Sequence, residues 1–118
     1  MVRMMSFSHT VEQIRQRTKT VTRRLDWLDL KPGERFMAVK KAMGLKPGEK
    51  VERLALLECV SNRREPLMDV TRQDVTREGF PYMTRFQFIR FFQSIANLPP
   101  DGKVSRIEFK YVEDRENV

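Results

Sequence analysis

Residues 17–24 read RTKTVTRR, which places four cationic side chains and three threonines within eight positions. Residues 1–24 contain six lysines and arginines and one acid, Glu12, so they carry a charge of +5 out of the chain's net +7. Burying a cation costs free energy, and threonine hydroxyls need hydrogen-bond partners. The stretch is therefore predicted to form a surface that binds an anion, phosphate above all. A solvated basic turn without a ligand is the alternative.

The composition describes a single-domain protein with an ordinary hydrophobic core. The chain has 118 residues, of which 40% are apolar. Its one cysteine, Cys59, lies within the apolar run 54–60 and is expected in the core. With one histidine and no cluster of cysteines and histidines, the sequence predicts neither a metal site nor a cofactor. It has no signal-peptide pattern and no apolar stretch of membrane-spanning length, which predicts a cytoplasmic protein.

Two helices are predicted from capping boxes, in which a threonine stands three positions before a glutamine. Thr10 begins a predicted helix over residues 11–17, and Thr84 begins a longer one over residues 85–97. The longer helix is expected to bury an apolar stripe. That stripe consists of Phe88, Phe91, Phe92 and Ile95, and it is widened by Phe86 and Ile89.

Strands are predicted from apolar runs bounded by turn residues. The predicted ranges are 6–8, 35–40, 51–60 with an end at Pro66, and 103–112. The run 51–60 is apolar on both faces, which is typical of a central strand. The pentapeptide LKPGE occurs at 30–34 and again at 45–49, and Pro-Gly suits the centre of a type II turn. In the last strand the residues alternate between two predicted faces, with Ser105, Ile107, Phe109 and Tyr111 on one and Arg106, Glu108 and Lys110 on the other.

The order of these elements predicts an α+β fold. A further short helix, capped by Thr71 and ended by Gly79, lies between the central strand and the longest helix. The last strand must pair with a distant partner, and the simplest closure is a small, partly open β-barrel decorated by three helices. We expect one domain over residues 1–118, with a core at 7–112 and a polar tail at 113–118.

Three segments, in the same order, resemble the ASCH family, whose fold is a β-barrel similar to the PUA domain of RNA-modifying enzymes. They are KTVTRR at 19–24 after a short helix, KPGE at 31–34, and DVTREGF at 74–80 followed by 84–92 and a last strand with IEF at 107–109. One position departs from the family: Arg17 stands where a glycine usually ends the helix. It adds a cation beside the site, which favours a polyanionic ligand over a neutral nucleoside.

The resemblance implies a cleft suited to RNA or to a nucleoside. Some similar small bacterial proteins hydrolyse the acetyl amide of N4-acetylcytidine with a lysine, a threonine and a glutamate, and other members are described as ribonucleases. Carried over to this sequence, the candidates are Lys19, Thr22 and Glu78. Lys19 must have a lowered pKa to serve as a base, and a turn must bring it to the same side as Thr22. A structural Lys19–Glu78 ion pair and an ordinary strand threonine are the alternatives.

Three functions are compatible with these features. The leading one is a module that binds RNA or nucleotides in a basic cleft built from Arg17, Lys19, Arg23 and Arg24. The second is a small hydrolase, either an amidohydrolase of acetylated cytidine or a ribonuclease. The third is a protein-binding module with an exposed surface of Phe80, Tyr82 and Met83 beside Arg77 and Arg85. The single tryptophan, Trp27, is compatible with stacking on a base and with packing alone.

Overall fold

The computed structural model describes residues 2–113, and a curved sheet of five strands forms its centre. The strands are β1 (Arg3–Ser6), β2 (Val21–Arg24), β3 (Arg35–Val39), β4 (Arg53–Pro66) and β5 (Lys103–Tyr111). Their order in the sheet is β1-β3-β4-β5-β2, with β1 parallel to β3 and every other pair antiparallel. Because β1 and β2 are the two edges, the barrel is open between them.

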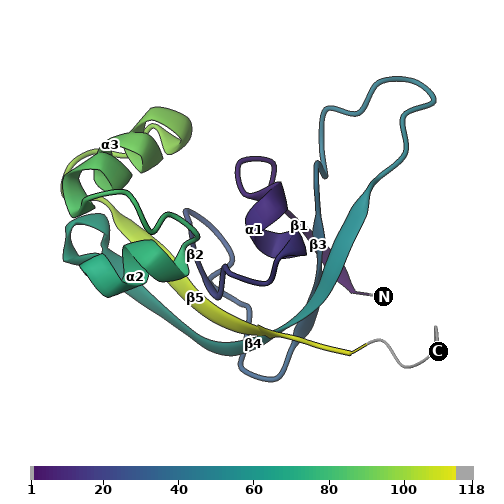
Figure 1. Cartoon of the computed structure of the whole chain (residues 1–118), viewed down its shortest axis with the longest axis horizontal. Helices are drawn as coiled ribbons and strands as arrows, with labels where there is room; N and C mark the ends of the chain where they lie inside the picture. The colour runs from purple at the N-terminus through teal and green to yellow at the C-terminus, as the bar shows by residue number, and fades with distance from the viewer. Residues whose placement is uncertain (1, 114–118) are drawn as a thin grey trace.

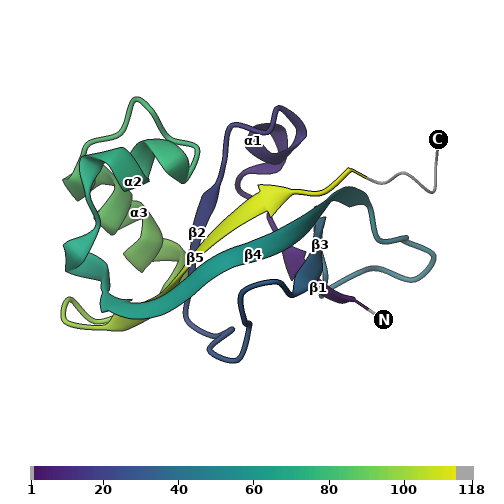
Figure 2. The ribbon, with the colours of Figure 1, turned by 90° about the horizontal axis from the view of Figure 1, so that it is seen from below.

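The long strand β4 organises the sheet, as the prediction of a central strand required. It pairs with β3 on one side and with β5 on the other, and the β4–β5 register shifts between Cys59 and Ser61. Figures 1 and 2 show β4 and β5 running side by side between the α2–α3 end and the β1–β3 end. The predicted end at Pro66 is confirmed. The first strand is Arg3–Ser6, and the prediction of 6–8 is wrong because residues 3–6 are the ones that pair with β3.

Three α-helices accompany the sheet: α1 (Val11–Arg15), α2 (Arg72–Arg77) and α3 (Arg85–Ala96), with a 3-10 turn at Leu67–Asp69. The predicted caps at Thr71 and Thr84 are confirmed, and the Thr84 capping box is complete. The Thr10 box is wrong: its hydroxyl accepts no capping bond, and the Gln13 amide donates instead to the carbonyl of Gly79.

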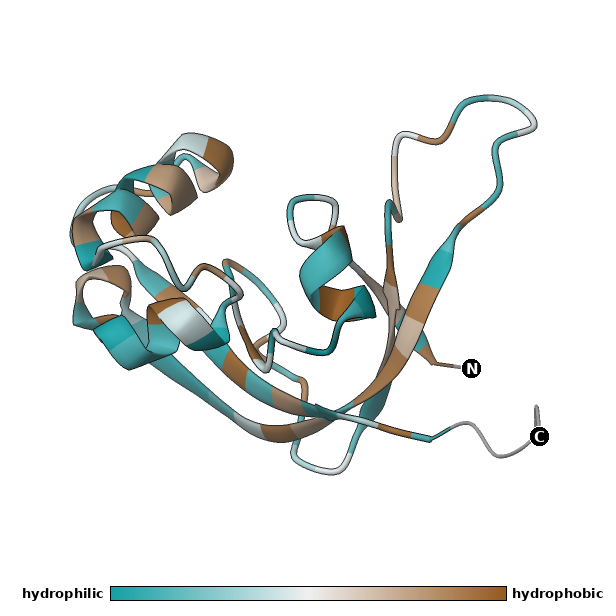
Figure 3. Ribbon diagram, viewed as in Figure 1, coloured by the Kyte–Doolittle hydropathy of each residue, from teal (hydrophilic) through white to brown (hydrophobic). Residues whose placement is uncertain are grey.

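The apolar side chains form two separate clusters. The first, inside the curve of the sheet, consists of Met5, Phe7, Ile14, Leu30, Phe36, Ala38, Leu57, Cys59, Ile107 and Phe109. The second, beneath α2 and α3, consists of Leu67, Val70, Val75, Phe88, Ile89, Phe92 and Val104. Hydrophobic and hydrophilic bands alternate along β5, which serves both clusters (Figure 3). The predicted α3 stripe is wrong at Phe86 and Ile95, which are 67% and 46% exposed.

The fold class predicted from the sequence is confirmed as α+β, with a half-barrel sheet and three helices. On the face of β5 that carries Arg106, this side chain is buried and bonds Asp74 of α2. Of the predicted polar tail at 113–118, residues 114–118 lie outside the described residues. In the part of the chain that the structure describes, no helix has the length and apolar character to cross a membrane.

Candidate functional site

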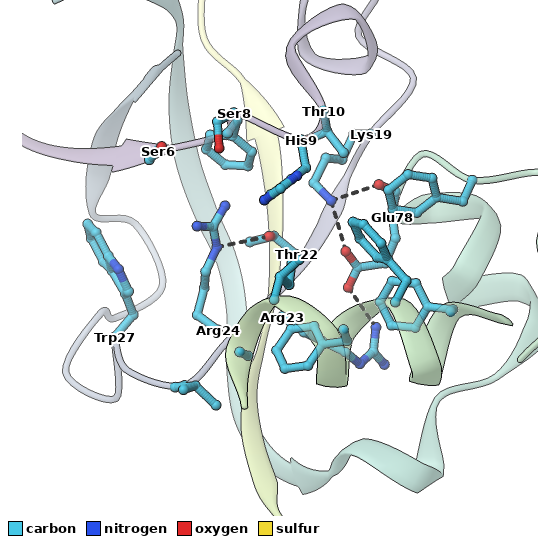
Figure 4. A pocket seen from close by; sticks show the side chains of 18 of the residues that line it. Ser6, Ser8, His9, Thr10, Lys19, Thr22, Arg23, Arg24, Trp27 and Glu78 are labelled. Carbon is cyan, nitrogen blue, oxygen red and sulfur yellow. Dashed lines mark hydrogen bonds and ion pairs between the residues drawn. The ribbon is translucent and has the colours of Figure 1, made fainter. Parts of the chain in front are cut away.

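A cavity of about 380 Å³ lies where the basic stretch passes the long helix. Its walls come from the segment between β1 and α1, from β2 and the loop after it, from the end of α2 and from one face of α3 (Figure 4). The polar residues in these walls are Ser6, Ser8, His9, Thr10, Lys19, Thr22, Arg23, Arg24, Asp26 and Glu78. The three residues implied by the ASCH resemblance are therefore brought to one cavity.

Lys19 enters the cavity because the chain is held in a turn before β2 begins at Val21. The Lys19 amide donates to the carbonyl of Gln13 at 3.3 Å, and the Tyr111 hydroxyl donates to the Lys19 carbonyl at 2.6 Å. The next amide, of Thr20, donates to the carbonyl of Arg77 at 2.8 Å. These contacts supply the turn that the sequence required, so Lys19 and Thr22 line the same cavity.

Lys19 and Glu78 form a buried ion pair at one side of the cavity. The Lys19 ammonium lies 2.8 Å from Glu78 Oε1 and donates to the Glu78 carbonyl at 2.7 Å, and both residues are 3% exposed. Burial lowers the pKa of Lys19, the Glu78 carboxylate opposes that shift, and Arg24 and Arg23 add to it. A lysine with a lowered pKa can release a proton to solvent and accept one from a substrate or hydroxyl.

Arg24 is the cation that the protein leaves least neutralised in this cavity. Its Nε donates to Thr22 Oγ1 at 3.1 Å, and its guanidinium carbon lies 4.7 Å from the centre of the Phe7 ring. Among residues 2–113 it forms no ion pair, although every other cation in the cavity wall does. Burial lowers the pKa of Arg24 to about 10, so it stays charged at neutral pH. Its two terminal nitrogens are available to an anion.

Arg23 has a different place from the one predicted. Its side chain is 1% exposed and pairs with the carboxylates of Glu65 at 2.9 Å, Asp74 at 2.6 Å and Glu78 at 3.0 Å. Asp74 also accepts from Arg106 at 2.7 and 3.0 Å. The expectation that Arg23 lies at the surface is therefore wrong. It links β2 to α2 and fixes Glu78, which in turn holds Lys19.

Arg17 lies away from the cavity. It is exposed, pairs with Glu113 at 3.0 Å and stands over the Tyr111 ring at 5.4 Å. Its φ of 60° is the left-handed conformation that follows a helix C-cap, a conformation that glycine adopts more readily than arginine. The expectation of another cation beside the site is wrong for Arg17.

The predicted protein-binding surface is only partly exposed. Tyr82 is 97% exposed, but Phe80 and Met83 pack against the cluster beneath α2 and α3. The Arg85 side chain is used to bond the carbonyls of Val70 and Met68, both at 2.6 Å. One exposed aromatic ring does not make a docking surface.

Two aromatic side chains in the cavity wall were not placed there by the sequence analysis. His9 lies edge-on to Phe91, with ring centres 5.7 Å apart, and Trp27 borders the other side of Arg24 (Figure 4). Their positions depend on the packing of loops against α3 and β3, which leaves no local pattern in the sequence. Within residues 2–113 there is no group of three or more His, Cys, Asp and Glu side chains arranged to hold a metal ion.

Comparison with known proteins tests the fold. A scan against protein-family models and a search of curated proteins both give no match. Among solved structures, protein EF3133 from Enterococcus faecalis V583, of the family DUF984, aligns with a TM-score of 0.66 and 18% identity over 95% of this chain and 80% of that one. An ASCH domain from Lactobacillus crispatus JV V101 aligns with a TM-score of 0.61 and 12% identity over 93% and 79%.

Identities this low establish the fold and nothing finer. Both alignments include nearly all of the described residues, so they span the half-barrel and its helices together. The resemblance inferred from three short segments is confirmed at this level: the chain has an ASCH-like fold.

Proposed function

We propose that this protein binds RNA or nucleotides, and that the phosphate is bound by Arg24 in the cavity. The observation that carries the proposal is the guanidinium of Arg24, which lines the cavity without forming an ion pair among the described residues. Arginine presents several N–H groups in a plane that matches the oxygens of a phosphate. The volume of about 380 Å³ lies within the range of small-ligand sites.

Fewer cationic side chains can contact a ligand in this cavity than the sequence suggested. Arg23 is neutralised by three carboxylates and Arg17 lies elsewhere, so the proposal rests on Arg24, with Lys19 deeper in the cavity beside Glu78. The ASCH domain of Lactobacillus crispatus has a similar fold, and the resemblance to the ASCH family implies a cleft suited to RNA. This likeness supports the proposal without determining the ligand.

A binding experiment with a labelled single-stranded RNA tests the role of Arg24. Fluorescence anisotropy should give an affinity that falls steeply with added salt, because phosphate contacts release counterions. Arg24→Ala should weaken binding about tenfold or more. Arg90→Ala, which removes the same charge from the exposed surface of α3, is the matched control and should bind within about twofold of wild type. Equal affinity of Arg24→Ala and wild type would remove Arg24 from the proposal.

A second candidate function, hydrolysis of the acetyl amide of N4-acetylcytidine, is favoured by the Lys19–Glu78 pair. The amine is buried, has a lowered pKa and lies in the same cavity as the Thr22 hydroxyl. In this reaction neutral Lys19 takes a proton from Thr22 or from water, the oxygen adds to the acetyl carbon, and the C–N bond breaks as Lys19 returns the proton to the leaving amine. Where Thr22 is the nucleophile, water activated in the same way then hydrolyses the acetyl-threonine ester and frees the hydroxyl. Water is consumed, and acetate and cytidine are released.

The pH profile of turnover tests this second function. Neutral Lys19 is the active base, so the rate should rise with pH through a pKa below the ordinary lysine value of about 10.4. Lys19→Arg keeps a cation beside Glu78 but cannot act as a base, and it should abolish turnover while the protein stays folded. Lys40→Arg, at an exposed position, is the control and should leave the rate unchanged. The rates of the wild type and of both variants are measured by chromatography of the nucleoside products. Turnover by Lys19→Arg at the wild-type rate would contradict the hypothesis.

A further inference from the structure

We infer that Trp27 is a base-stacking platform, so that the cavity takes a nucleotide with its base on the indole and its phosphate at Arg24. The inference rests on the proposed nucleotide binding and specifies the ligand further. It requires an aromatic base and an anionic group within one molecule, which excludes neutral nucleosides and simple phosphates as full ligands.

The backbone of Trp27 is the first observation. Its φ is +65°, in the left-handed region where a bulky side chain is disfavoured. Such a conformation costs of the order of 1–3 kcal/mol and persists only where the surroundings impose it. The left-handed backbone at Trp27 therefore marks a position at which the surrounding structure fixes the direction of the ring.

The surroundings do impose this conformation. The Trp27 carbonyl accepts from the Asn62 amide at 2.7 Å and from the Leu30 amide at 3.3 Å. The guanidinium carbon of Arg3 lies 4.0 Å from the centre of the indole, and Arg3 is itself held by Asp29 at 3.1 Å. One face of the ring is thus covered and the ring is fixed in place. The indole also packs against the Phe36 ring of the core, with ring centres 6.0 Å apart, and the partly buried residue borders the cavity, where a base would meet it.

The position of Trp27 relative to the charges is the third observation. Figure 4 shows it at one side of the cavity, with Arg24 between it and the Lys19–Glu78 pair. An aromatic base on the indole therefore places an attached phosphate next to Arg24. Stacking is tolerant of base identity because every base has a π-face, so the predicted selectivity is for nucleotides as a class.

The chain carries a built-in reporter for this inference, because Trp27 is its only tryptophan. Indole fluorescence of the wild-type protein is titrated with cytidine 5′-monophosphate, cytidine and ribose 5-phosphate. The nucleotide should quench the emission at the lowest concentration, cytidine should quench it about tenfold less effectively, and ribose 5-phosphate should leave it nearly unchanged. Equal responses to cytidine 5′-monophosphate and ribose 5-phosphate would overturn the stacking site.

Variants separate the ring from the backbone. Trp27→Gly suits a positive φ, so it removes the indole without adding strain. It should weaken single-stranded RNA binding by roughly 5- to 150-fold, and Trp27→Phe should stay within about threefold of wild type. Circular dichroism of both variants verifies the fold, and Leu28→Gly, at a neighbouring residue that is 64% exposed, controls for changes in the loop.

The outcomes distinguish this inference from the proposed function. If RNA binding depends on Arg24 and Trp27→Gly binds like wild type, nucleotide binding stands and stacking on Trp27 is overturned. If the wild-type protein binds neither RNA nor cytidine 5′-monophosphate, the proposed function fails, and the stacking site fails with it. Loss of binding in Trp27→Gly and retention in both Trp27→Phe and Leu28→Gly establishes the platform.

Discussion

Asp74 holds two buried arginines that come from different strands. Its carboxylate bonds Arg23 of β2 at 2.6 Å and Arg106 of β5 at 2.7 Å, and it is itself buried. Asp74→Asn would remove the charge and leave Arg106 nearly without a counter-ion, whereas Arg23 keeps two carboxylates. We expect a loss of about 3 kcal/mol in the free energy of unfolding. Urea denaturation measures it, with Asp69→Asn at an exposed position as the control; an equal effect of both variants would contradict the prediction.

The same carboxylate predicts how stability depends on pH. Burial raises the pKa of Asp74, but hydrogen bonds and charges from Arg106 and Arg23 outweigh this and hold it well below its usual range. A lowered folded-state pKa stabilises the fold above the unfolded value of about 3.9 and loses that contribution as pH falls through the folded pKa. Wild-type stability should therefore decrease below about pH 4, and the decrease should be shallower in Asp74→Asn. If the free energy of unfolding fell equally with pH in the two proteins, acid unfolding would be caused by other groups.

At the scale of elements, the end of α2 is fitted against α1 at Gly79. Its φ is +103°, and an added Cβ would lie 2.8 Å from the side chain of Gln13, whose amide donates to the Gly79 carbonyl. Gly79→Ala should destabilise the fold by about 2 kcal/mol and displace the adjacent Glu78 from Lys19. Gly33 has a φ of +90° and no atom within 4 Å of an added Cβ. Gly33→Ala therefore introduces the backbone strain without a steric clash, and it should lower the stability of the fold by less. Thermal denaturation compares them, and equal losses would show that the contact with α1 is unimportant.

Prediction from sequence succeeded where the signal was local to an element. The cap at Thr71, the stop at Gly79 and the end of β4 at Pro66 each follow from the chemistry of one or two residues. The capping box predicted at Thr10 is wrong because the side chain of Gln13 donates to the carbonyl of Gly79, just after α2. Strand alternation separates the two faces of β5 but does not say what covers each one, and α2 covers the face of Arg106 with Asp74.

In the candidate site, too, contacts between distant parts of the chain could not be predicted from the sequence. Lys19, Thr22 and Glu78 were selected by resemblance to the ASCH family, and the structure brings them to one cavity. The distinction between Arg23, which is neutralised, and Arg24, which is not, depends on three carboxylates far away in the sequence. No pattern within residues 17–24 contains that information.

On the scale of the whole molecule, two apolar clusters are joined by the β4–β5 pair and by the buried ion network between them. The central pair should open only on global unfolding, while β1, a four-residue edge, should open locally. Hydrogen exchange measured by NMR should find amides of β4 and β5 the slowest and those of β1 at least about tenfold faster. Equal protection of β1 and β4 would indicate that the sheet opens as one unit.

The pairing of β2 with β5 has a consequence for synthesis of the protein. Val21 pairs with Glu108 and Arg24 with Ser105, so the strand that carries the basic stretch acquires its neighbour only when the last part of the sheet has left the ribosome. Until then β2 has no neighbour in the sheet, and the nascent chain presents its cationic segment beside the anionic RNA of the ribosome itself. Once the sheet is complete, Lys19 and Arg23 are paired with buried carboxylates, and Arg24 forms no ion pair among the described residues.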